Sequence, residues 1–170
     1  MDRINIKNLF QLPDVFRLPE LMASFVTMML FRCMPIDKET VPGLIVLTLA
    51  EALVDGADAG ASTSTPEFSI FVFYGFFFIC VVQIVATLFG EKSPMSNLVI
   101  ALCGFIFYLS IGSRIIHLGV VVSGNIFSEN IEGPMKALGS LSVLTSFIYC
   151  ADAGFRVYKF IKLNEYNLLR

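Results

Sequence analysis

Charged residues are scarce in this chain of 170 residues. Asp, Glu, Lys and Arg make up 15% of it and apolar residues 56%, whereas a soluble domain has about 25% charged residues. A single domain of this length cannot bury so much apolar surface in its own core. We therefore expect an integral membrane protein, with the lipid bilayer as the solvent of much of the chain.

Motifs that carry chemistry are missing as well. The only histidine is His117, and one imidazole with dispersed cysteines supplies no set of metal ligands. No Ser/His/Asp combination, phosphate-binding glycine loop or convergent carboxylate pair is recognisable, and no basic tract favours nucleic acid. We expect no enzyme, and no cofactor, metal, nucleic acid or small-molecule substrate.

The cysteine positions do not predict a disulfide framework. Cys80, Cys103 and Cys150 lie in apolar runs and Cys33 at the end of another, whereas secreted frameworks place paired cysteines in polar loops. We interpret all four as small apolar side chains. Palmitoylation of Cys150 is the second interpretation.

Four segments are long enough to cross a bilayer, since about 20 apolar residues in a helix span about 30 Å of hydrocarbon. They predict an all-α fold, a four-helix transmembrane bundle in one domain of residues 1–170. The expected spans are 13–34, 68–90, 96–121 and 135–158. Between them we expect a long first extracellular loop, 35–67, and a shorter one, 122–134.

The first span differs from the others because it carries charge. If it begins at Pro13, a favourable first-turn residue, it is long enough to cross. Asp14, Arg17 and Glu20 then share one helix face near the inner membrane surface. We expect them to pair with each other and to point at water or headgroups.

The first loop contains a short apolar stretch, residues 43–54, that is too short for a span. Its length is typical of an interfacial or re-entrant helix, and these two possibilities stay open. A small, polar connector follows it, which indicates a turn or loop.

The charges predict the topology, because Lys and Arg accumulate on the cytoplasmic side of short loops. Eight of the twelve basic residues lie in the N-terminal segment up to Arg17, between the second and third spans, or in the C-terminal segment from Arg156 on. The two intervening loops are acidic instead. We therefore expect both termini in the cytoplasm and two acidic extracellular loops.

Ionisable residues at membrane depth are costly and often functional. We expect Asp152 to pair with Arg156, four residues on, or with Arg17 on the first helix. Arg114 and His117, one turn apart, lie at another depth; we expect Arg114 to reach outward or to meet an acid of the first loop. These five residues are candidates for structural ion pairing or, alternatively, for coupling to ion transport.

Small residues at helical spacing let helices approach closely in lipid. They predict that the third and fourth spans hold the bundle together, and contact with a neighbouring membrane protein is the alternative. The residues are Gly104, Gly112, Gly139, Ser142 and Ser146.

The acidic loops offer a surface for other integral membrane proteins, in a homo-oligomer or a hetero-oligomer. We expect exposed carboxylates there that meet a partner. The candidates are Glu39, Glu51, Asp55, Asp58, Glu129 and Glu132.

The chain lacks the Trp motif and loop cysteines of claudins and the Cys-Cys-Gly motif of tetraspanins. Sparse positions across residues 68–160 carry another pattern: Phe89-Gly90; Gly104, Phe107-Tyr108, Gly112 and His117; and Gly139-Ser140-Leu141, Val143, Tyr149 and Asp152, with a weaker match at Leu30-Phe31-Arg32. This pattern resembles that of Snakeskin-type and MARVEL-like tetraspan proteins of arthropods.

This resemblance implies a non-enzymatic scaffold of the plasma membrane, at lateral cell–cell (smooth septate) junctions, that organises an epithelial barrier. The first loop departs from the family pattern, because it is apolar and contains no Trp. A MARVEL-type protein of vesicle trafficking or membrane fusion is one alternative. An accessory subunit of a channel or transporter is another.

Overall fold

The computed structural model describes residues 14–36, 39–55, 64–89, 94–122 and 129–168. Almost all of them are helical, and one short hairpin is the exception. In chain order the elements are the 3-10 turn η2 (Asp14–Phe16), α1 (Arg17–Arg32), the strands β1 (Met34–Ile36) and β2 (Glu39–Val41), α2 (Gly43–Asp55), α3 (Ser64–Ile70), the π-helical turn η3 (Phe71–Gly75), α4 (Phe76–Leu88), α5 (Pro94–Val122) and α6 (Glu129–Leu168).

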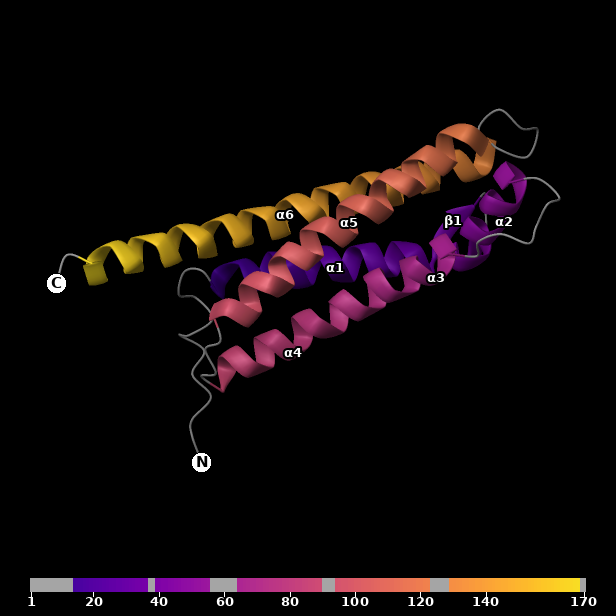
Figure 1. Ribbon diagram of the computed structural model, residues 1–170. Coiled ribbons are helices and arrows are strands. Elements are labelled where there is room, and N and C mark those ends of the chain that lie inside the picture. The colour runs from indigo at the N-terminus through magenta and orange to yellow at the C-terminus, as the bar shows by residue number, and fades with distance from the viewer. Residues whose placement is uncertain (1–13, 37–38, 56–63, 90–93, 123–128, 169–170) are drawn as a thin grey trace.

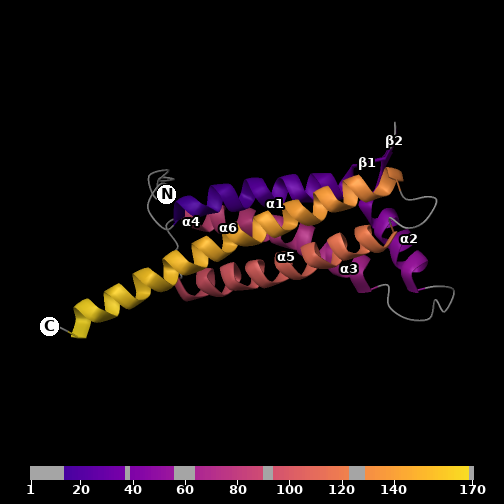
Figure 2. The ribbon, with the colours of Figure 1, turned by 90° about the horizontal axis from the view of Figure 1, so that it is seen from above.

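Four helical rods lie side by side: α1, the continuous α3–η3–α4, α5 and α6 (Figures 1 and 2). The rods alternate in direction. The beginning of α1, the end of α4, the beginning of α5 and the end of α6 lie towards one end of the bundle, which we call the tail end (Figure 1). The strands and α2 lie at the opposite end, which we call the hairpin end.

Three of these rods are long and apolar enough to cross a membrane: Thr65–Leu88, Met95–Val122 and Ile131–Lys162. The all-α class and three helices of spanning length are thereby confirmed. The first rod is shorter than the expected span 13–34, because α1 has 16 residues. Pro13 lies outside the described residues. At the C-terminal end of α1, the Cys33 amide donates to the Met29 carbonyl, and the chain then continues into β1.

The long first loop holds more structure than the sequence predicts. β1 and β2 pair antiparallel, with Met34 opposite Val41. These strands have only three residues each, too few for a recognisable alternation of apolar and polar residues. The short apolar stretch forms α2, as expected, and the next helix begins at Ser64 instead of residue 68.

α6 is longer than the expected span 135–158 at both ends. It begins six residues earlier, at Glu129, and runs through Pro134. Glu132 forms an ion pair with Lys136, which holds together the turn that contains the proline. No Pro or Gly interrupts the chain after residue 154, so the helix continues to Leu168 and passes the ends of the other rods (Figures 1 and 2).

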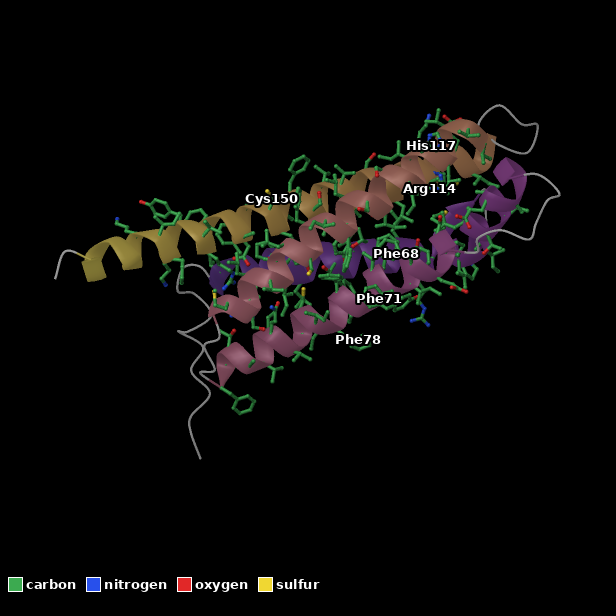
Figure 3. The ribbon with its side chains drawn as sticks, viewed as in Figure 1. Phe68, Phe71, Phe78, Arg114, His117 and Cys150 are labelled. Carbon is green, nitrogen blue, oxygen red and sulfur yellow. The ribbon has the colours of Figure 1, made fainter. Side chains whose placement is uncertain are left out.

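Apolar side chains lie on the outside of the bundle as well as inside. Phe71 and Phe78 on the second rod are exposed (Figure 3), while Phe73 and Phe76 of the same rod are buried. The interior also contains buried polar residues from α1, the second rod and α6, among them Ser24, Thr27, Gln83, Thr87, Ser142, Thr145 and Asp152. A surface that is apolar around a partly polar interior is what lipid, rather than water, stabilises.

Candidate functional site

Four ionisable side chains meet inside the bundle towards the tail end, and we call them the charge cluster. Arg17 and Glu20 come from α1, and Asp152 and Arg156 from α6; they are 3%, 2%, 1% and 9% exposed. α1 packs against α6, and residues three or four apart on a helix share a face. The interface between the two helices therefore holds two acids and two bases.

A short ion pair lies within the charge cluster. The Nε–H of Arg156 donates to Oδ2 of Asp152 at 2.6 Å. This is the pairing expected between Asp152 and the arginine four residues on. Glu20 interacts electrostatically with both arginines and with Asp152. Glu20 Oε1 and Asp152 Oδ1 nevertheless have no hydrogen-bond donor among the described residues.

The sequence prediction for the start of the first helix is wrong in one respect. Arg17 and Glu20 were expected to point at water or headgroups, but both are buried against α6. The signal was present in the sequence, since Ser24 and Thr27 continue the same polar face and are fully buried too. A polar face about three turns long indicates a polar partner inside a membrane bundle.

A second polar group follows the charge cluster towards the middle of the bundle. The hydroxyl oxygens of Ser24 and Tyr149 are 3.1 Å apart, and Sγ of Cys80 lies 2.9 Å from the same tyrosine oxygen. The three side chains come from α1, α6 and α4, so this group ties three rods together. Sequence analysis assigned Cys80 only a packing role and did not connect it with Ser24.

Aromatic rings fill the next layer. Tyr108 of α5 and Tyr149 of α6 are stacked, with ring centroids 5.6 Å apart and an interplanar angle of 17°. The Phe76 ring meets both of them edge-on. Gly104 allows this arrangement, because a Cβ there would lie 2.6 Å from Cδ1 of Tyr149.

The predicted small residues lie where α5 and α6 pack together. A Cβ on Gly112 would lie 2.9 Å from the Gly139 carbonyl oxygen and 3.0 Å from Cβ of Ser142. Ser142 and Ser146 are buried, and their hydroxyls donate to the Leu138 and Val143 carbonyls of their own helix. These contacts bring the two backbones close together.

Other small residues of α6 face away from the bundle. Cys150, Ala151 and Gly154 are exposed, and a Cβ on Gly154 would have no other atom within 4 Å. Figure 3 shows Cys150 on the outer side of α6. We call the exposed residues Ser140, Leu144, Phe147, Ala151 and Gly154 the outer face of α6.

Arg114 and His117 are both exposed on α5, on the hairpin-end part of the helix (Figure 3). They are not part of the charge cluster. In the described part of the chain, no hydrogen bond or ion pair joins Arg114 to Glu51, one of the acids expected to meet it. The expectation that it reaches outward agrees with its exposure.

The acidic loop residues do not form one exposed group. Glu51 was expected to be exposed, but it is 5% exposed, on the face of α2 that also buries Leu47 and Ala50. Glu132 is half-buried in its pair with Lys136. Asp58 and the side chains of Glu39, Asp55 and Glu129 lie outside what the structure describes.

Among the described residues, no group of three His, Cys, Asp or Glu side chains could hold a metal ion. Comparison with protein-family models, with curated proteins and with solved structures finds no match for this chain.

Proposed function

We propose that this chain is a four-span scaffold protein of the plasma membrane, without enzymatic activity, that assembles with other integral membrane proteins through the outer face of α6. Both chain ends lie in the cytoplasm, and the hairpin end faces outward. The single observation that carries the proposal is the contrast between the two sets of small residues on α5 and α6.

Small residues are used in membranes where helices approach closely. Gly112 and Gly139 already have such a contact, with each other's helix. Gly154 has no such contact within the chain. Packing against lipid tails does not require a glycine, because lipid tails adapt to a side chain of any size. A helix of a neighbouring protein would use the space beside Gly154 and Ala151, and this supports a lateral contact there.

The length and surface of α1 support a fourth span. The 3 residues of η2 and the 16 of α1 rise by about 30 Å in total, close to the thickness of the hydrocarbon core. The outer side of α1 carries the exposed apolar residues Met22, Phe25, Val26 and Met29. Lipid is the solvent that such a side requires.

The junction assignment rests on the resemblance to Snakeskin-type tetraspan proteins. With the topology that the basic residues favour, the hairpin end with its acidic segments faces the extracellular space. A lateral scaffold with one outer end is suited to contacts between neighbouring cells.

The test uses the full chain with a C-terminal tag in polarised insect epithelium. The wild-type protein should concentrate at lateral cell contacts, with tag staining only after permeabilisation, and should migrate in native gels of mild detergent extracts as an assembly larger than the monomer. Gly154→Leu should dissociate that assembly into monomers, because the added side chain fills the space that the neighbouring helix would occupy.

The matched control is Val85→Leu, which adds bulk to an exposed position of α4 and should leave the assembly intact. If Gly154→Leu keeps both the assembly and the lateral staining, the outer face of α6 is not the contact. Vesicular staining of the wild type would favour the trafficking alternative.

A second candidate, an accessory subunit of a channel or transporter, is favoured by the buried charge cluster. Its test is Asp152→Asn, compared with Arg114→Gln and His117→Gln. A change in conductance at unchanged surface level would support it.

A further inference from the structure

We infer that residues 157–162 of α6 bind the headgroups of anionic phospholipids, in the leaflet at the tail end of the bundle. We call these residues the α6 tail. The inference rests on α6 as a membrane span and is independent of the assembly through the outer face of α6.

The first argument is the depth of the α6 tail in the bilayer. The apolar helix Ile131–Lys162 has 32 residues, which rise by about 48 Å along the helix axis. The hydrocarbon core is only about 30 Å thick, whereas the bilayer with both headgroup layers is about 40–45 Å thick. A helix of this length therefore has its last turns in a headgroup layer.

The neighbouring helix α5 begins at the level of the α6 tail. Gly104 of α5 lies against Tyr149 of α6, and α5 begins at Pro94, about ten residues before Gly104. Because the two helices run in opposite directions, this beginning is level with a point about ten residues after Tyr149. The α6 tail thus lies where the described rods end, as Figures 1 and 2 show.

The second argument is the kind of side chain that the α6 tail exposes. Tyr158, Phe160 and Ile161 are 62%, 47% and 60% exposed. Lys159 and Lys162 are exposed too, and at about 100° per residue they lie on the side of the helix opposite Phe160 and Ile161. A helix with an apolar side and a basic side is suited to the boundary between acyl chains and headgroups.

The third argument is charge. Residues 153–164 contain three basic residues and no Asp or Glu. Arg156 is buried in its pair with Asp152, so the two lysines carry the surface charge of the α6 tail. Such a positive surface at headgroup depth is complementary to the phosphate and carboxylate groups of anionic lipids.

The geometry of Lys162 agrees with this assignment. Its Nζ lies 5.9 Å from the centroid of the Tyr158 ring, which is a cation–π contact. This contact holds the ammonium beside an aromatic ring, the side-chain type that is enriched at membrane–water interfaces. A lysine ammonium has three N–H donors, so it can bind phosphate oxygens while it stays near the ring.

The experiment uses the absence of Trp from the chain, because a single introduced Trp then reports its own surroundings. The full chain with Phe160→Trp is reconstituted in phosphatidylcholine vesicles. These contain an equal minor fraction of either phosphatidylserine or phosphatidylcholine with brominated acyl chains, which quench Trp fluorescence on contact. One lysine near an anionic surface favours anionic lipid by about fivefold. We therefore expect stronger quenching by the brominated phosphatidylserine.

Substitution of both lysines, Lys159→Gln with Lys162→Gln, should make the two brominated lipids quench the same reporter equally. Lys136→Gln is the matched control, because Lys136 lies at the other end of α6 and is paired with Glu132. It should leave the difference unchanged. A second reporter, Val121→Trp, occupies an exposed position of α5 at the hairpin end and should show equal quenching by the two lipids.

Equal quenching of Phe160→Trp by both lipids would mean that the α6 tail contacts lipid without a preference for anionic headgroups. Quenching by neither lipid would mean that the α6 tail lies in water. Either result would overturn the inference, as would a preference that survives substitution of both lysines. The assembly through the outer face is tested by Gly154→Leu instead, so the two proposals fail separately.

Discussion

Gly104 on α5 lies directly against the ring of Tyr149 on α6, so closely that a Cβ at residue 104 would fall between 2.6 and 2.8 Å from three ring atoms. The ring itself is held by its stack with Tyr108 and by its hydroxyl contacts to Ser24 and Cys80. It therefore cannot move aside without disturbing three other rods.

Gly104→Ala should destabilise the bundle for this reason. Overpacking of a well-packed interior costs about 1–3 kcal/mol. The control is Gly133→Ala on α6, since a Cβ there also meets nothing within 4 Å. Both substitutions gain the same helix propensity, so the difference between their unfolding free energies in detergent measures the contact with Tyr149. Equal stabilities would contradict the packing of α5 on α6 described above.

The Tyr149 hydroxyl should contribute to stability separately from its ring. Tyr149→Phe removes the contacts to Ser24 and Cys80, and we expect a loss of about 1 kcal/mol, the net value of a typical hydrogen bond. Tyr158→Phe removes a hydroxyl from an exposed tyrosine of the same helix and should change the unfolding free energy by less. If Tyr158→Phe lowered the unfolding free energy more than Tyr149→Phe, the contacts among Ser24, Cys80 and Tyr149 would not stabilise the packing of the three rods.

The sequence predicted the parts of this fold that depend on local pattern. Long apolar runs indicated the three rods of spanning length, because a helix in lipid needs only enough apolar residues in a row. Even the burial of Glu51 could have been predicted, since it lies four residues after Leu47 on the buried face of α2.

The charge cluster could be predicted only in part. Asp152 and Arg156 are one turn apart, so their ion pair follows from spacing alone. The burial of Glu20 against Asp152 depends on the rotation and depth of α1 relative to α6, which no local pattern fixes. The same is true of Cys80, because its partners Ser24 and Tyr149 lie on two other rods.

The two ion pairs of α6 should differ strongly in their effect on stability. Arg156→Ala leaves Asp152 buried without the donor to its Oδ2, and removing one partner of a buried pair costs about 3–5 kcal/mol. Lys136→Ala breaks the pair with Glu132, whose side chains are 43% and 29% exposed, and should cost about 0.5 kcal/mol. Unfolding free energies of the two variants, measured in the same detergent, provide the comparison.

If Arg156→Ala is no more costly than Lys136→Ala, the Arg156 guanidinium does not stabilise the buried Asp152 carboxylate. The exchange Asp152→Arg with Arg156→Asp keeps one charge of each sign at the same two positions. It should recover part of the stability that Arg156→Ala loses.

The fourth span can be tested through Cys33, a free and exposed cysteine directly after α1 at the hairpin end. If α1 crosses the membrane from a cytoplasmic N-terminus, a maleimide that cannot cross membranes should label Cys33 in intact cells. Cys80 is buried, and Cys103 and Cys150 lie within the apolar helices α5 and α6, at a depth in the bilayer that a maleimide unable to cross membranes does not enter.

Cys33→Ser should therefore abolish labelling of intact cells, while Cys150→Ser should leave it unchanged. Labelling of Cys33 only after permeabilisation would put the hairpin end in the cytoplasm. Because α1 and the second rod both reach that end (Figure 1), the result fixes the orientation of the whole bundle, and with it the side on which the acidic segments can meet a partner.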